Sequence, residues 1–291
     1  MKLQGILVPI VTPFTADDQV DVAALKQLVE HFVAQGVAGI VACGTTGEYY
    51  ALSEAEREQV LRTVVETVNG RATVIAGINA LSTQTSIQYA HQAEELGYDG
   101  IMLATPPYSL PEQAGIIEHF RTVAQATKLP MIMYDFPARV GVQIAIETAV
   151  ELAKVPNIVG IKESSGNFNR ALALMQLRIP DFEIISGSDD MAADFLFWGC
   201  RSWISGGANV FPGEQAAMMA AADKGDWDEV RRLMSGMYPL IQAMEAGDYN
   251  QKAKLGCRRH GVNAGGVRLP LSQLSEADSQ AFASMLDAYQ R

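Results

Sequence analysis

The stretch 158–164, Ile-Val-Gly-Ile-Lys-Glu-Ser, joins a short apolar run to a lysine and then to polar residues. Such a run is typical of a strand buried on both faces in a parallel sheet. An ammonium at its end is expensive to desolvate unless a partner or a chemical role holds it there. Burial lowers the pKa of a lysine, and the neutral amine attacks carbonyl carbon. Lys162 is therefore a candidate Schiff-base lysine, and a lysine that snorkels to solvent is the simpler alternative.

The same succession of a short apolar run, a polar break and an amphipathic stretch recurs along the chain. The expected strands are Ile6–Val11, Gly39–Ala42, Thr73–Gly77, Gly100–Ala104, Met131–Tyr134, Ile158–Lys162, Glu183–Ser186 and Ser202–Ser205. Helical periodicity follows each strand, and Ser53 with Glu56 has the spacing of a capping box. The expected helices are 22–35, 54–68, 83–95, 112–126, 145–154, 168–177, 189–198 and 213–222.

Strict alternation of strands and helices predicts parallel strands joined by right-handed crossovers. Eight units favour an α/β fold of the TIM (β/α)8 barrel type over residues 1–224. A doubly wound sheet is the alternative, but no Gly-x-Gly-x-x-Gly follows the first expected strand. Residues 225–291 are expected to form a C-terminal helical extension that is an appendage rather than a second catalytic domain. Its expected helices are Trp227–Met244, Asn250–His260 and Glu276–Tyr289.

Composition narrows the class of partner. Among 291 residues, 33 are acidic and 22 basic, giving a formal charge of −11, which argues against nucleic acid as a partner. No apolar run has transmembrane length, and the N-terminus has no signal-peptide pattern, so no membrane association and a cytoplasmic location are expected. The three scattered cysteines, Cys43, Cys200 and Cys257, are expected to be reduced thiols.

In a barrel of this kind the chemistry belongs at the C-terminal ends of the strands. Hydroxyls, a phenol, a guanidinium and one amine converge there, and Gly187 and Ile204 fall at the ends of the seventh and eighth strands. No set of histidine, cysteine or carboxylate residues there has metal-ligand spacing, and Cys257 with His260 is interpreted as ordinary packing. We therefore expect neither a metal nor another cofactor.

Three features at these strand ends each have two interpretations. The loop 44–47, Gly-Thr-Thr-Gly, can offer N–H groups and the hydroxyls of Thr45 and Thr46 to a carboxylate, or can be a plain turn. Tyr134 can pass protons to an imine, or can be a buried tyrosine with one hydrogen bond. Arg139 can grip a carboxylate with two hydrogen bonds, or can be a surface arginine.

Three segments together carry a family resemblance: 44–48 (Gly-Thr-Thr-Gly-Glu), 134–141 (Tyr-x-x-Pro-x-Arg-x-Gly) and 160–166 (Gly-Ile-Lys-Glu-Ser-Ser-Gly). At these separations they resemble the dihydrodipicolinate synthase and N-acetylneuraminate lyase family of class I pyruvate aldolases. The resemblance implies that Lys162 forms an imine with pyruvate or another 2-oxo acid, and that Tyr134 and Thr46 relay protons.

The resemblance also implies roles for further residues. Thr45, Gly187 and Ile204 would contact the 2-oxo acid, and Arg139 would hold the carboxylate of an aldehyde substrate. Tyr108 would cross a subunit boundary to complete the proton relay of a neighbour, so a homodimer or homotetramer is expected. Pro106, Pro107 and Pro111 stiffen the loop around Tyr108.

The preferred activity is the condensation of pyruvate with aspartate semialdehyde in the diaminopimelate route to lysine. Alternatives are an aldolase or dehydratase of 2-keto-3-deoxy sugar acids, an N-acetylneuraminate lyase and a deaminase of a cyclic hydroxyproline metabolite. A catalytically silent, ligand-binding barrel is the alternative of another class. Asp135 and the pair Tyr49–Tyr50 depart from the family pattern, and bulky groups at the mouth would suit a different second substrate.

Lysine, an effector of some synthases in this family, is not expected to bind here. The residues that align with its site are Tyr49, Tyr50, Glu54, Arg57, Leu81 and Thr85. The two tyrosines would fill the volume, and Leu81 offers no hydrogen bond to an amino-acid headgroup. A site that has lost its hydrogen-bonding partners discriminates strongly against its former ligand.

Overall fold

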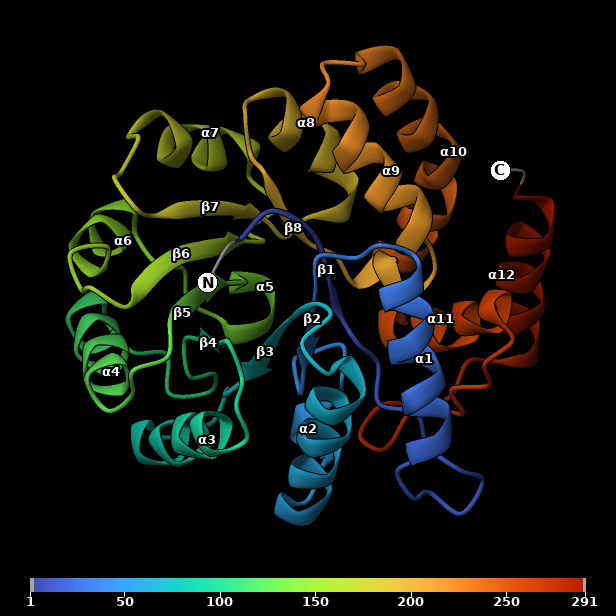
Figure 1. Cartoon of the computed structure of the whole chain (residues 1–291), viewed down its shortest axis with the longest axis horizontal. Helices are drawn as coiled ribbons and strands as arrows, with labels where there is room; N and C mark the ends of the chain where they lie inside the picture. The colour runs from blue at the N-terminus through green and yellow to red at the C-terminus, as the bar shows by residue number, and fades with distance from the viewer. Residues whose placement is uncertain (1–2, 290–291) are drawn as a thin grey trace.

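The chain folds around a closed barrel of eight parallel strands, in a computed structural model that describes residues 3–289 (Figure 1). The strands follow one another around the barrel in chain order, and β8 pairs with β1 to close it. They are β1 Gly5–Pro9, β2 Gly39–Ala42, β3 Thr73–Gly77, β4 Gly100–Ala104, β5 Met131–Asp135, β6 Ile158–Glu163, β7 Glu183–Ser186 and β8 Ser202–Ile204. The predicted barrel is confirmed.

Side chains alternate between the inside and the outside of the barrel, as the period of a strand requires. Inside, Leu7, Val41, Ile75, Ile132 and Ile185 belong to one apolar cluster that fills the barrel. Their neighbours along each strand pack outward against the helices in a second, larger cluster. The interior of the barrel is thus solid, and polar chemistry is confined to its ends.

Helices surround the barrel (Figure 1). The predicted capping box at the start of α2 is present, because the Ser53 hydroxyl accepts the Glu56 N–H and the Glu56 carboxylate accepts the Ser53 N–H. The bounds are α1 Val22–Ala34, α2 Glu54–Val68, α3 Thr83–Glu95, α4 Gln113–Gln125, α6 Ile146–Leu152, α7 Phe168–Gln176, α8 Ala192–Phe197 and α9 Pro212–Asp223.

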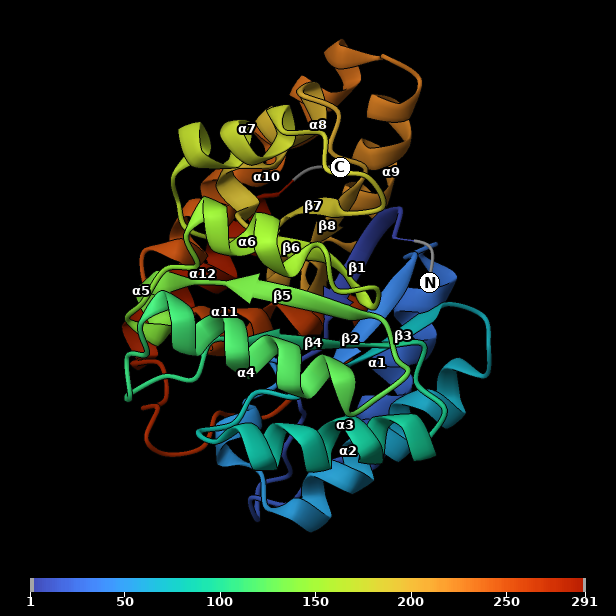
Figure 2. The ribbon, with the colours of Figure 1, turned by 90° about the vertical axis from the view of Figure 1, so that its left-hand side faces the viewer.

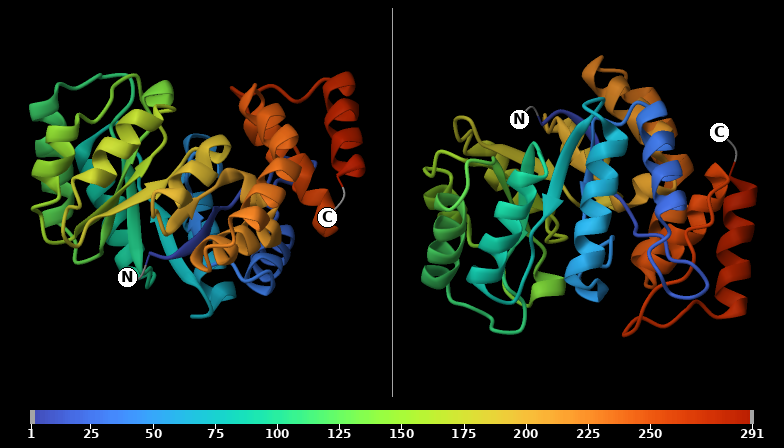
Figure 3. Two further views of the ribbon diagram at one scale, coloured as in Figure 1. Left: turned by 90° about the horizontal axis from the view of Figure 1, so that it is seen from above. Right: turned by 60° about the horizontal axis from the view of Figure 1, so that its bottom comes forward.

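Three further helices, α10 Trp227–Glu245, α11 Tyr249–Gly256 and α12 Glu276–Ala288, form the C-terminal region. α10 packs on α9, and α12 packs on α10 and α11, so that α12 is the outermost helix on this side (Figure 3). A turn at Lys224 and Gly225 separates α9 from α10. The division of the chain into two regions at this turn stays a prediction.

The structure differs from the predicted elements where side chains or turn residues override periodicity. The 3-10 turn Asp189–Met191 interrupts the helix expected over 189–198, because the Asp189 carboxylate is bound by groups of the eighth strand and its loop. A short helix, α5 Pro137–Val140, begins with proline at its first position and ends at Gly141, whose φ is 78°. This helix was expected to be loop. It lies just beyond the end of β5 (Figure 2).

The C-terminal region shows the same kind of difference. The helix expected over Asn250–His260 is α11 followed by the 3-10 turn Cys257–His260. Cys43, Cys200 and Cys257 are all free and buried, as predicted. Within residues 3–289, no helix combines the length and the apolar character needed to span a membrane.

Candidate active site

Lys162 lies near the C-terminal end of β6 with only 5% of its surface exposed. Neighbours along β6 alternate, so Ile161 packs outward on the helices while Lys162 faces the barrel axis. Burial lowers the pKa of the Lys162 ammonium to about 8, and the carboxylates of Asp189 and Glu245 oppose this fall. About a tenth of Lys162 is therefore a neutral, nucleophilic amine at pH 7, far more than for a lysine in water.

Tyr134 is the Cα partner of Lys162 in the parallel ladder between β5 and β6. The Lys162 Nζ lies 4.2 Å from the centre of the Tyr134 ring. Burial raises the pKa of the Tyr134 phenol well above its usual value, although the Ser164 hydroxyl opposes this rise. Tyr134 is consequently a neutral phenol that can pass a proton beside the amine by accepting one as it gives up its own.

The loop 44–47 follows β2 and brings Thr45 and Thr46 to the same end of the barrel. The Thr12 hydroxyl donates to the Gly47 carbonyl at 2.7 Å, which ties the loop to the segment after β1. The Asn250 side-chain amide of α11 donates to the Thr45 carbonyl at 3.2 Å. These hydrogen bonds fix the loop from two sides.

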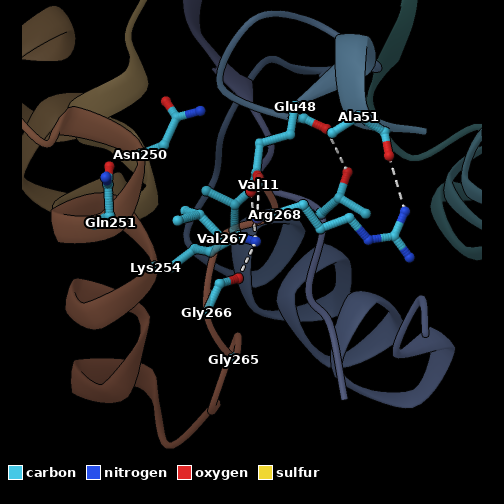
Figure 4. A network of polar contacts seen from close by, with 12 residues as sticks. Val11, Glu48, Ala51, Asn250, Gln251, Lys254, Gly265, Gly266, Val267 and Arg268 are labelled. Atoms are coloured by element: carbon cyan, nitrogen blue, oxygen red, sulfur yellow. Dashed lines mark hydrogen bonds and ion pairs between the residues drawn. The ribbon is translucent and has the colours of Figure 1, made fainter. Parts of the chain in front are cut away.

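Glu48, the next residue, anchors this loop to the C-terminal region (Figure 4). Its fully buried carboxylate lies 2.5 Å from the Lys254 Nζ and accepts the Arg268 backbone N–H at 3.0 Å. The Lys254 ammonium also donates to the Gly266 carbonyl at 2.6 Å. Because Glu48 has a left-handed backbone with φ of 54°, this buried pair also holds the chain in an uncommon conformation.

Lys162, Tyr134 and the loop surround a cavity of about 60 Å³. Its lining residues are Thr45, Thr46, Tyr134, Phe136, Arg139, Lys162, Gly187, Asp189, Gly206, Glu245, Tyr249 and Asn250. A second hollow of about 310 Å³ adjoins it and shares Thr45, Tyr134 and Arg139, among others. Tyr49 and Tyr50 line this outer hollow, so the bulky pair lies at the mouth, as predicted from its place in the sequence.

Two residues of the seventh strand end shape the cavity floor. A Cβ on Gly187 would lie 2.0 Å from the Ser164 Oγ and 2.8 Å from the Lys162 Cγ, so only glycine leaves room for the lysine. The Asp189 carboxylate accepts hydrogen bonds from Trp203 Nε1 at 3.0 Å, the Gly207 N–H at 2.9 Å and the Tyr249 hydroxyl at 2.6 Å. These three hydrogen bonds hold the Asp189 carboxylate in place at the cavity.

Most of the predicted site residues meet in the cavity, and two do not. Thr45, Thr46, Tyr134, Arg139, Lys162 and Gly187 all line it. Ile204 does not line it, because its fully buried side chain packs within the apolar interior of the barrel. Tyr108 has 95% of its surface exposed and does not contribute to the cavity of its own chain. Its role across a subunit boundary stays a prediction.

Sequence reasoning gave no role to six lining residues: Phe136, Gly206, Asp189, Glu245, Tyr249 and Asn250. The last three belong to α10 and α11 or lie at their ends, in the region expected to be an appendage. No local pattern marks them. Asn250 is hydrogen-bonded to Thr45 and Tyr50 across 205 and 200 positions of the chain, and Tyr249 to Asp189 across 60. Asp189 was recognised as a strand-end residue but received no role.

Asp135, which departs from the family pattern, points away from the cavity. Its carboxylate pairs with the Arg170 guanidinium at 2.9 Å and accepts the Ile144 N–H at 3.0 Å. Arg170 also pairs with Glu163 at 2.9 Å. Burial raises the pKa of Asp135 to about 6 while Arg170 opposes the rise. The residue therefore fastens β5 and β6 to the helix behind them, and it does not touch a substrate in the cavity.

The residues that the structure describes contain no group of three or more histidine, cysteine, aspartate or glutamate side chains arranged as metal ligands. The chemistry that the visible groups can perform is that of a desolvated amine, a neutral phenol, two hydroxyls and a guanidinium. Together they suit covalent catalysis on a carbonyl compound that bears a carboxylate.

The fold and the cavity define a TIM-barrel protein with a lysine amine at the end of its sixth strand. The Dihydrodipicolinate synthetase family matches residues 2–289, and the chain belongs to this family. Similar proteins named 4-hydroxy-tetrahydrodipicolinate synthase occur in Methanosarcina barkeri, 39% identical over 97% of each chain, and in Cellvibrio japonicus, 40% identical over 94% of each.

A solved structure gives the same result. The chloride-inhibited dihydrodipicolinate synthase of Acinetobacter baumannii, complexed with pyruvate, has a TM-score of 0.95 and 35% identity over 98% of each chain. The predicted family and the predicted enzyme class, a class I aldolase-type lyase, are thus confirmed.

Proposed function

We propose that the protein condenses pyruvate with aspartate semialdehyde through an imine at Lys162, as a 4-hydroxy-tetrahydrodipicolinate synthase. The observation that carries this proposal is the buried Lys162 amine, with its pKa of about 8, in one cavity with Tyr134 and Arg139. The names of the relatives at 39% and 40% identity support it, as does the neighbouring structure that holds pyruvate.

In the first half of the reaction, the Lys162 amine attacks the ketone carbon of pyruvate, water leaves, and a protonated imine forms. The imine withdraws electrons, so a proton leaves the methyl carbon to give an enamine. Tyr134 and Thr46 lie where they can carry these protons. The backbone N–H groups and hydroxyls of Thr45 and Thr46 would bind the pyruvate carboxylate.

In the second half, the enamine carbon attacks the aldehyde carbon, a carbon–carbon bond forms, and the alkoxide takes a proton. The amino group of the former aldehyde then attacks the imine carbon, the Lys162 amine departs, and the ring closes. Arg139 would hold the carboxylate of the aldehyde, because its side chain reaches the cavity from α5.

The proposal needs no further cofactor, because the imine itself is the electron sink. We therefore expect dialysis against a chelator to leave the turnover unchanged. If the chelator abolished turnover and added metal restored it, this expectation would be wrong.

The test is a panel of second substrates with pyruvate: aspartate semialdehyde, 2-keto-3-deoxygluconate, N-acetylneuraminate and the cyclic hydroxyproline imine. We expect turnover with aspartate semialdehyde alone. Arg139→Ala should lower that turnover by roughly tenfold or more and leave pyruvate trapping at Lys162 intact. Turnover of any other member of the panel, with aspartate semialdehyde ignored, would overturn the assignment.

We infer further that the chain works as a homodimer or homotetramer. Tyr108 and Leu110 are 95% and 55% exposed and both have a positive φ, so a conspicuous apolar loop is displayed toward solvent. Sedimentation at micromolar concentration should show at least a dimer. A monomer would remove the role of Tyr108 in a shared proton relay.

A further inference from the structure

The cavity contains a carboxylate that none of the steps above uses. Glu245 is the last residue of α10, and it lines the cavity together with Lys162 and Arg139. Ile241 and Met244, in the preceding turn of α10, are buried in the apolar core. The end of the helix is thereby held in place, and the position of Glu245 at the cavity follows from packing rather than from a mobile loop.

Neither Glu245 nor Arg139 forms a close ion pair, although the charges of Lys162 and Arg139 act on Glu245 and the Arg139 guanidinium lies 5.8 Å from the centre of the Phe136 ring. Within residues 3–289, no hydrogen bond or ion pair joins the Glu245 carboxylate or the Arg139 guanidinium to another side chain. By contrast, the buried charges nearby are paired, as Glu48 is with Lys254 and Asp135 is with Arg170. Two opposite charges therefore line one small cavity without a close ion pair of their own.

The surroundings of Glu245 favour a cationic ligand. Although Glu245 is exposed, the protein around its carboxyl group partly desolvates it, and this raises the pKa of Glu245 to about 7. The carboxylates of Asp189 and Asp190 add to the rise, whereas Lys162 and Arg139 oppose it. Once the imine at Lys162 has lost a proton to become a neutral enamine, a cationic ligand beside Glu245 would again balance these acidic groups.

We propose that Glu245 recognises the α-ammonium group of the aldehyde while Arg139 binds its α-carboxylate. The pair would then select an aldehyde that carries both charges on one carbon, which is the headgroup of an amino acid. This inference rests on the proposed function, since it concerns the second substrate of that reaction. It assigns Glu245 a role in specificity, separate from the chemistry at Lys162.

Discrimination of this kind is expected because each charged group of the aldehyde gains a charge-assisted hydrogen bond that an analogue without that group cannot form. An aldehyde without the ammonium, such as succinate semialdehyde, keeps the contact with Arg139 and loses the one with Glu245. Removing the charge of Glu245 should therefore harm only the amino aldehyde. Removing the charge of Arg139 should harm both aldehydes.

The experiment compares kcat/KM for aspartate semialdehyde and for succinate semialdehyde in wild type, Glu245→Gln, Glu245→Asp and Arg139→Ala. If a variant does not turn over succinate semialdehyde, the binding of this aldehyde is measured instead as its inhibition constant in the reaction with aspartate semialdehyde. Glu95→Gln is the matched control, because Glu95 is exposed at the end of α3, away from the cavity. Borohydride trapping of pyruvate at Lys162 shows that each variant is folded.

We expect Glu245→Gln to lower the preference for aspartate semialdehyde by roughly tenfold or more, and Glu245→Asp to recover part of it. Arg139→Ala should lower the values for both aldehydes, and Glu95→Gln should change neither. An unchanged preference in Glu245→Gln, or an equal fall for both aldehydes, would overturn the inference. Failure of the wild type to use aspartate semialdehyde would instead overturn the proposed function, so the two failures are distinguishable.

Discussion

Two regions of the molecule form the cavity, and they place their side chains by different means. β5 and β6 bring Tyr134 and Lys162 together through the register of a parallel ladder. The C-terminal helices bring Asn250 to Thr45 across 205 positions of the chain, through packing and hydrogen bonds. The pairing of β5 with β6 follows from the local strand pattern of the sequence. The contact of Asn250 with Thr45 forms only when the whole chain has folded. In the proposals above, the chemistry belongs to the barrel, whereas substrate selection draws on both parts of the chain through Arg139 of α5 and Glu245 of α10.

This comparison suggests that changes in the two regions should have different consequences. A substitution at a strand end should affect the chemical step and leave folding largely intact. A substitution in the contacts between the barrel and the C-terminal helices should affect stability or substrate binding first. The predictions below test that difference, beginning with the largest expected effect.

Lys162→Ala should reduce turnover by roughly 10⁴-fold or more, because no other described side chain in the cavity offers a comparable amine. The barrel itself should persist, since the substitution removes a desolvated ammonium rather than an apolar core residue. Steady-state kinetics measure the first effect, and circular dichroism during thermal unfolding measures the second. A variant that keeps a tenth of wild-type turnover would show that Lys162 is not the nucleophile.

Glu48→Gln should lower the free energy of unfolding by about 3–5 kcal/mol, because the Lys254 ammonium would stay buried without its counter-charge. Equilibrium urea unfolding measures this loss. The double variant Glu48→Gln with Lys254→Met removes both charges and should recover most of the stability. Equal losses in the single and double variants would mean that the pair does not join the loop to the C-terminal region.

Asn250→Ala should raise the KM for pyruvate by roughly fivefold, because a neutral hydrogen bond to the Thr45 carbonyl contributes about 1 kcal/mol. The effect on kcat should be smaller, since Asn250 holds the loop that binds the carboxylate and takes no part in proton transfer. Kinetics with pyruvate as the varied substrate separate the two parameters. A fall in kcat at constant KM would place Asn250 in the chemical step instead.

Free lysine should have no effect on turnover, which is the smallest change expected. Leu81 is 71% exposed and Tyr50 is 44% exposed, so neither forms a preformed polar pocket within one chain. The Arg57 guanidinium is engaged by the Gly77 carbonyl at 2.9 Å and lies 3.9 Å from the centre of the Tyr89 ring. Titration of lysine in a calorimeter checks this, and saturable binding would show that the alignment of these residues to the effector site is wrong.

The sequence allowed the barrel and the Lys162 end of the cavity to be predicted, because strand period and strand-end position are local properties. Gly187 and Arg139 were recognised for the same reason, and both line the cavity. Ile204 was predicted to contact the substrate and does end β8, but its side chain packs in the apolar interior of the barrel and does not line the cavity. Glu245 and Tyr249 lie where two helices meet, and only tertiary packing brings them to Lys162.

The central claim is that Lys162 is an amine with a lowered pKa that forms an imine with pyruvate. Protein should be mixed with pyruvate at pH 6 to 10, quenched into borohydride after short times, and mapped by peptide mass spectrometry. Because the neutral amine is the reactive form, labelling should rise roughly tenfold per unit of pH below the pKa and level off near the pKa of about 8. The account predicts a single modified lysine, Lys162, with this profile. Labelling at another lysine, no labelling, or a rate that still climbs steeply above pH 9 would contradict it.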